Sequence, residues 1–217
     1  MRLLPICLIF VVASIMAPLN AANTYDLIFR TGTLDDVPKT AVLQYDRAVM
    51  VRDDPEMSAQ NTGLIRLSFE ADDMARLRYQ QGDKHRDIGS FPATVGNPII
   101  MYFVETVVRD VAKNAGGSPF YIRNRVKESL SQFAEIVDAS ADFGDDDVAV
   151  QQVTLRPFLN DPNRSKMKGY EDLSITVTMS DDVPGWYYSL AAQAGSVGGN
   201  ALLYRNALTL VAKDLVQ

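Results

Sequence analysis

Hydrophobic and polar residues alternate over several short stretches of the chain, which is typical of β-strands with one buried face. The alternation covers residues 65–70 and 75–80 on either side of the turn-forming residues 71–73, and it predicts a β-hairpin. Leu27–Arg30 and Val42–Val51 are two earlier predicted strands, separated by a turn at residues 35–38.

The middle of the chain changes to a helical pattern. Asn97 followed by Pro98 is typical of a helix start, so a helix is predicted from Pro98 to about Asn114, ended by Gly116-Gly117. Ser118-Pro119 repeats the start signal and predicts a second helix through Leu130.

Strand patterns return after residue 148 and cover residues 148–155, 173–179 and 186–190. Ala201–Leu215 is predicted to be a final helix, because its leucines and valines recur on or near one face. The sequence therefore predicts one α+β domain over residues 22–217, with an antiparallel, curved sheet and about three helices on one face.

The first residues have the composition of a secretory signal peptide. Arg2 supplies a positive charge, Leu3–Ala17 form an apolar run, and cleavage is expected after Ala21. The mature protein would then be periplasmic or secreted from a bacterium, and it would not be an integral membrane protein. The alternative is an uncleaved membrane anchor, against which Pro18 and Asn20 interrupt the apolar run.

Cysteine content and charge narrow the classes of protein further. The only cysteine, Cys7, lies in the predicted signal peptide, so the mature chain can form no disulfide and depends on its core. The formal net charge is -6 and no long basic stripe opposes it, so nucleic acid is not an expected partner. The short basic groups at residues 84–86, 123–127 and 164–168 are typical of solvated surface.

Apolar side chains of the first predicted helix and of the strand near residue 186 exceed what a small sheet needs. If the sheet curves around the helices, Met101, Tyr102, Phe103, Trp186 and Tyr188 would line a cavity for an apolar small molecule or a lipid. The alternative is that these side chains simply fill the core.

Two short motifs occur twice. A Gly-Gly pair is followed after five residues by Arg-Asn, at Gly116, Gly117, Arg123 and Asn124 and again at Gly198, Gly199, Arg205 and Asn206. If both copies begin helices, the two arginines would project toward a shared anion or partner, held by the two asparagines. The alternative is that a glycine loop and a cap begin many helices. Asp-Asp-Val-Pro also recurs, at residues 35–38 and 181–184, but at a different offset, which argues against one clean duplication.

No catalytic motif is complete. His85 is the only histidine, so a tetrahedral zinc site would lack its usual partners, although a general base beside carboxylates is compatible with the sequence. Ser196 lacks the preceding glycine of a nucleophile elbow, and the acidic residues 53–56 and 142–147 lack the spacing of a calcium loop. We therefore expect no catalytic residue, metal or cofactor.

These patterns favour an exported, non-catalytic binding protein of the bacterial cell envelope that holds an apolar ligand, a lipid or an envelope protein. Two alternatives stay open. One is a carboxylate-dependent hydrolase, in which acidic pairs would converge on His85. The other is a structural or assembly factor that acts through the helix carrying Arg123, Arg125 and Lys127.

Overall fold

The computed structural model describes residues 21–132, 134–195 and 202–211. Within them the helices are α1 (Ala21–Ile28), α2 (Pro55–Asn61), α3 (Ile99–Ala115) and α4 (Pro119–Leu130). The strands are β1 (Val42–Val51), β2 (Gly63–Glu70), β3 (Met74–Gln81), β4 (Lys84–Pro92), β5 (Ile136–Phe143), β6 (Asp146–Leu155), β7 (Ser174–Met179), β8 (Tyr187–Ala194) and β9 (Tyr204–Val211).

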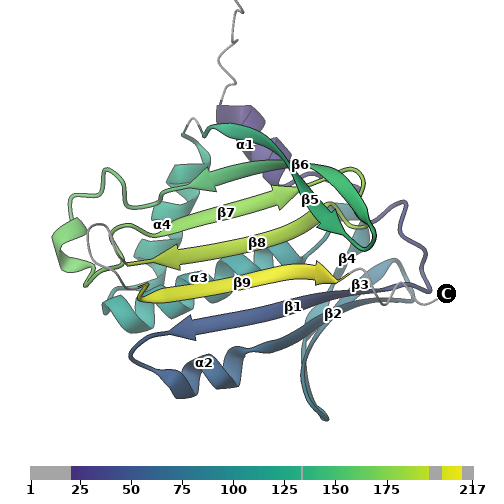
Figure 1. Cartoon of the computed structure of the whole chain (residues 1–217), viewed down its shortest axis with the longest axis horizontal. Coiled ribbons are helices and arrows are strands. Elements are labelled where there is room, and N and C mark those ends of the chain that lie inside the picture. Colours follow the sequence, from purple (N-terminus) through teal and green to yellow (C-terminus); the bar gives the residue numbers. More distant parts are fainter. Residues whose placement is uncertain (1–20, 133, 196–201, 212–217) are drawn as a thin grey trace, which may run out of the picture.

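All nine described strands belong to one antiparallel sheet with the order β4-β3-β2-β1-β9-β8-β7-β6-β5. The chain builds one half with β1 to β4, crosses through α3 and α4, and builds the other half from β5 inward (Figure 1). The last described strand, β9, then pairs with β1 and joins the halves, with Val49 opposite Asn206. The predicted fold class is confirmed: a curved antiparallel sheet with α3 and α4 across one face.

The hydrophobic core lies between the sheet and these two helices. Phe103, Val107 and Val111 of α3 are fully buried, because they recur at helical spacing on the side that faces the strands. From the sheet, Tyr45 and Leu208 point to the same face and are fully buried. Helix α3 therefore runs across the centre of the sheet, where β1 and β9 meet (Figure 1).

Two predicted elements are wrong. Leu27–Arg30 is not a strand, because residues through Ile28 belong to α1. The predicted helix Ala201–Leu215 contains a strand over Tyr204–Val211, and its positions 201 and 212–215 lie outside the described residues. In both places a short apolar run is compatible with either structure, and β9 is decided by two neighbouring strands that pair with it.

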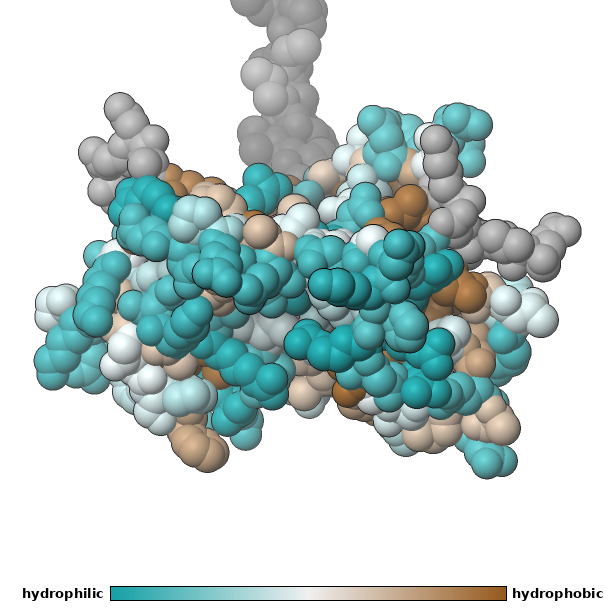
Figure 2. Space-filling view, turned by 90° about the horizontal axis from the view of Figure 1, so that it is seen from below, coloured by the Kyte–Doolittle hydropathy of each residue, from teal (hydrophilic) through white to brown (hydrophobic). Residues whose placement is uncertain are grey.

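The surface is largely polar on the side seen from below. Figure 2 shows hydrophilic residues over most of this side, with hydrophobic residues in small separate groups. Within the described part of the chain, no helix is both long enough and apolar enough to cross a membrane.

Candidate functional site

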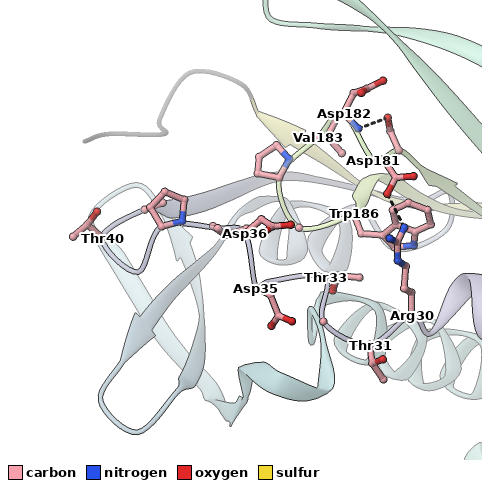
Figure 3. Close-up of a pocket in the computed structure, with 17 residues that line it drawn as sticks. Arg30, Thr31, Thr33, Asp35, Asp36, Thr40, Asp181, Asp182, Val183 and Trp186 are labelled. Carbon is pink, nitrogen blue, oxygen red and sulfur yellow. Dashed lines mark hydrogen bonds and ion pairs between the residues drawn. The ribbon is translucent and has the colours of Figure 1, made fainter.

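The two Asp-Asp-Val-Pro motifs, which are far apart in the sequence, meet in space and form one cleft (Figure 3). One copy lies in the loop between α1 and β1, and the other lies in the turn between β7 and β8. We name this hollow the aspartate cleft; its volume is about 720 Å³. It is lined by Arg30–Thr33, Asp35–Pro38, Thr40, Ala41 and Ser180–Trp186.

The two motifs contribute the same residue types to the cleft, with the same pattern of burial over Asp-Asp-Val. Val37 and Val183 are buried and anchor the two loops, whereas the four aspartates are exposed. A valine between polar residues and a proline therefore fixes each loop to the core and leaves its carboxylates at the surface. The repetition in the sequence marks two walls of one cleft.

Two aromatic residues attach the end of α1 to the β7–β8 turn. The indole Nε1 of Trp186 donates a hydrogen bond to the carbonyl oxygen of Leu27 at 3.1 Å, and the Tyr187 hydroxyl donates to that of Ile28 at 2.6 Å. The last carbonyl groups of a helix have no partner within it, so these bonds satisfy them. They also fix the position of the loop that follows α1.

Asn97, the residue predicted to begin the central helix, ties both loops to α3. Its backbone N–H donates to the Thr33 hydroxyl at 2.8 Å, and its Nδ2 donates to the carbonyl oxygen of Gly185 at 2.9 Å and to the Tyr45 hydroxyl at 2.9 Å. Its Oδ1 accepts from the N–H of Ile99 at 3.1 Å. The Asn97 side chain thus holds the start of α3, the sheet and the wall at Gly185, and its backbone N–H holds the wall at Thr33.

The cleft carries an excess of negative charge. Its lining has four aspartates and one guanidinium, that of Arg30, which donates to Asp181 at 2.6 Å and lies 4.4 Å from the centre of the Trp186 ring. Asp35, Asp36 and Asp182 form no ion pair among the described residues. The chain's own arginine shows the chemistry that suits the cleft: a cation against a carboxylate and an aromatic face.

A second hollow, of about 500 Å³, lies between β4 and α3, and we name it the α3–β4 hollow. It is lined by Arg86, Asp87, Ile88, Phe91, Met101, Tyr102, Glu105, Thr106 and Arg109. Next to it is a set of polar residues that we name the polar network: the half-buried Tyr102 and Thr106, which also line the hollow, and the buried Arg47, Asp110, Tyr204 and Asn206.

The five residues predicted to line one apolar cavity are dispersed. Met101 and Tyr102 line the α3–β4 hollow, and Trp186 lines the aspartate cleft. Phe103 is fully buried in the core, and the Tyr188 hydroxyl donates to the carbonyl oxygen of Asp142 on β5. The structure brings together the first two residues of this set.

The predicted match between the two Arg-Asn pairs is wrong in its local structure. Arg123 and Asn124 lie on α4, whereas Arg205 and Asn206 lie on β9, and Gly198-Gly199 lie outside the described residues. Arg123 pairs with Glu105 of α3 at 2.9 Å, and both Asn124 and Arg205 are exposed. Asn206 is fully buried beneath α3, where it belongs to the polar network.

The groups considered for catalysis do not converge. His85 is exposed on β4, and its side chain has no hydrogen bond or ion pair among the described residues. Asp54 caps α2 by accepting from the N–H of Met57 at 2.9 Å, and this bond, with help from Lys113, lowers the pKa of its carboxyl. Within the described residues, no group of three or more His, Cys, Asp or Glu side chains could hold a metal ion.

No protein-family model matches this chain, and no curated protein matches it.

Both hollows have a signal in the sequence. For the aspartate cleft it is the repeated Asp-Asp-Val-Pro, which the sequence alone relates to duplication and not to a site. For the polar network it is a charged or polar residue at a position where the strand pattern calls for an apolar one, at Arg47 among buried Tyr45 and Val49, and at Asn206 between Tyr204 and Leu208.

Proposed function

We propose that this chain is an exported, non-catalytic binding protein of the bacterial cell envelope, and that the aspartate cleft holds its ligand. The observation that carries the proposal is the meeting of two identical motifs around one cleft with three carboxylates outside any ion pair in the described residues. The ligand that fits is a small organic cation with an apolar body, because the cleft combines these carboxylates with Trp186 and valine and proline side chains.

The proposed binding role includes export to the periplasm. Residues 1–20, which hold most of the predicted signal peptide, lie outside the described residues, so export and periplasmic localisation stay part of the proposal. The mass of the protein purified from the periplasm tests it. A chain that begins at Ala22 is expected, and a full-length chain in the membrane fraction would contradict export.

Trp186 gives a direct assay, because it is the only tryptophan of the chain and it lines the cleft. We expect phenethylammonium to change the tryptophan fluorescence saturably, and the neutral phenylethanol and the anionic phenylacetate to do so at least tenfold more weakly. The three probes share an aromatic body and differ in charge, so a comparison of them isolates the effect of the carboxylates. An equal response to all three probes, or no saturable response to the cation, would count against the proposed ligand.

A matched pair of variants separates the cleft from general charge. The double variant Asp36→Asn with Asp182→Asn is expected to weaken binding of the cation at least tenfold. Asp53→Asn with Glu56→Gln removes the same charge beyond the far end of β1, roughly 30 Å away at about 3.3 Å per residue, and should leave binding unchanged. Native mass spectrometry of the periplasmic protein should show a bound amine that only the first pair loses.

An apolar molecule or a lipid, which the sequence favours, is a second candidate ligand. One observation favours it: Met101 and Tyr102 lie together on the α3–β4 hollow, beside Ile88 and Phe91. For the two alternatives, no comparable observation exists in the described residues. His85 is exposed without a carboxylate partner, and two of the three cations on α4 are already paired, Arg123 with Glu105 and Arg125 with Glu128.

A further inference from the structure

The polar network contains a buried arginine in the centre of the sheet. Arg47 of β1 is only 3% exposed, and Asn206 of the neighbouring β9 is fully buried. Arg47 lies opposite Leu208, and Asn206 lies opposite Val49, so both polar side chains point to the face that α3 covers. Two adjacent central strands thus place a charge and an amide where apolar side chains are the rule.

The contacts of these two residues leave donor and acceptor capacity unused. Arg47 Nη1 donates to the Tyr102 hydroxyl at 3.0 Å, but its buried Nε has no partner among the described residues. Asn206 Nδ2 donates to Asp110 at 3.3 Å and to Thr106 at 3.4 Å, while its buried Oδ1 has no partner there. A buried polar atom without a partner destabilises the folded chain, because it has lost its hydrogen bonds to water.

The charge of Arg47 is also not neutralised nearby. Among the described residues, no carboxylate oxygen lies within 4.0 Å of a guanidinium nitrogen of Arg47, which is the limit for an ion pair. Asp110, the acid of the network, is 7% exposed, and burial raises the pKa of its carboxyl although the Tyr204 hydroxyl donates to it at 2.8 Å. An arginine side chain cannot lose its proton to escape burial, so an anion beside it would offset the cost.

A second cation approaches the same point from β4. Arg86 lies opposite Tyr79, on the helix face of the sheet, and its guanidinium is 5.5 Å from the centre of the Tyr79 ring. The positive charges of Arg47 and Arg86 both lower the pKa of Tyr102, against the larger effect of burial, which raises it. The two guanidinium groups therefore both act on the Tyr102 hydroxyl.

The α3–β4 hollow gives this point access to solvent. Tyr102 and Thr106 line the hollow and at the same time bond Arg47 and Asn206, so they are the members of the polar network that reach the hollow. The two acids of the lining are already neutralised, Asp87 by Arg76 at 2.8 Å and Glu105 by Arg123 at 2.9 Å. The volume of about 500 Å³ is within the range of roughly 300–1,000 Å³ of small-molecule sites.

We infer that the α3–β4 hollow binds an amphipathic organic anion, with its acidic head at Arg47 and Arg86 and its apolar body against Ile88, Phe91 and Met101. The head accepts the hydrogen bonds that the guanidinium groups have to spare, and the Tyr102 hydroxyl yields its place on Arg47. The inference rests on the second candidate ligand above and is independent of the aspartate cleft. Carboxylate and phosphate heads share this chemistry.

Titration calorimetry of the full mature chain tests the inference with decanoate as the probe, decyl phosphate as the second acid, and decanol as the neutral control. We expect one saturable site for decanoate and at least tenfold weaker binding of decanol. Arg47→Gln and Arg86→Ala should each weaken decanoate binding at least tenfold. Arg78→Ala removes the same charge from the neighbouring strand, on the other face of the sheet, and should change affinity less than twofold.

The outcomes separate the head from the body. If decanoate and decanol bind equally and neither Arg47→Gln nor Arg86→Ala changes the affinity, the proposed anion site is wrong, while the proposal of an apolar ligand stands. If neither compound binds, both are overturned. Should Arg47→Gln fail to fold, Arg86→Ala against Arg78→Ala decides, because both positions are exposed. The ratio of decyl phosphate to decanoate affinity identifies which acidic head the site prefers.

Discussion

Asn97 connects more of the structure than any other single side chain at the aspartate cleft, so Asn97→Ala is the most informative perturbation of the fold. The change removes three side-chain hydrogen bonds, to Tyr45, Gly185 and Ile99, with donor–acceptor distances of 2.9, 2.9 and 3.1 Å. At about 1 kcal/mol for each net bond, the loss is about 3 kcal/mol. The Tyr45 hydroxyl, fully buried, then lacks this partner, which raises the expected loss to about 3–5 kcal/mol.

Urea unfolding followed by circular dichroism measures this loss, provided that the slope of the transition stays unchanged. Asn124→Ala, at an exposed position of α4, is the matched control and should cost less than about 0.5 kcal/mol. A double-mutant cycle with Tyr45→Phe should give a coupling energy of about 1 kcal/mol for the Asn97–Tyr45 bond. A cost below about 1 kcal/mol for Asn97→Ala, or no coupling, would refute the view that this amide holds the cleft.

Three further predictions concern the core, the turn and the buried acid. Burial raises the pKa of Asp110 above its usual 3.8, so the stability it contributes is present below pH 3.8 and lost as the pH rises through its folded-state value. Asp110→Asn should therefore gain stability relative to wild type as the pH rises from about 4, measured by unfolding at each pH, and parallel pH profiles would contradict this. Phe103→Ala should lower the free energy of unfolding by about 3–5 kcal/mol, because its side chain is fully buried. Met101→Ala, at a side chain 59% exposed, should lower it by less than about 0.5 kcal/mol. Equal losses for the two variants in thermal unfolding would be inconsistent with the burial described. Gly185→Ala should destabilise the fold by about 1–3 kcal/mol, because the φ of Gly185 is +79° and a Cβ there would lie 2.8 Å from a leucine methyl. Gly82→Ala, with φ +56° and open space around the Cβ, should destabilise the fold less in the same assay.

The periodic elements could be predicted because their signals are local. The predicted strand Val42–Val51 matches β1 residue for residue, and the Asn97-Pro98 and Ser118-Pro119 signals begin α3 and α4 within one residue. The hairpin around residues 71–73 also agrees, with positive φ at Asp72 and Asp73. In each place the residue types that favour the element are neighbours in the sequence.

Elements without a strong pattern of their own were missed. β5 alternates only weakly, because two of its apolar positions are alanines, and it is exposed over most of its length. β4 carries four consecutive charged or polar residues at its start. Both lie at the edges of the sheet, where hydrogen bonds to one neighbour, and not burial, define the strand. The short α2 is defined by the cap that Asp54 provides.

The sequence by itself determined the α+β class, the central helices and the absence of a disulfide, because periodicity, caps and cysteine count are properties of neighbouring residues or of the whole composition. Only the tertiary structure decided that the two Asp-Asp-Val-Pro loops face each other and that Met101 and Trp186 lie in separate hollows. It alone also decided that Arg47 and Asn206 meet beneath α3. These juxtapositions depend on which strands pair, and the pairing of β1 with β9 joins residues more than 150 positions apart through contacts that leave no local pattern.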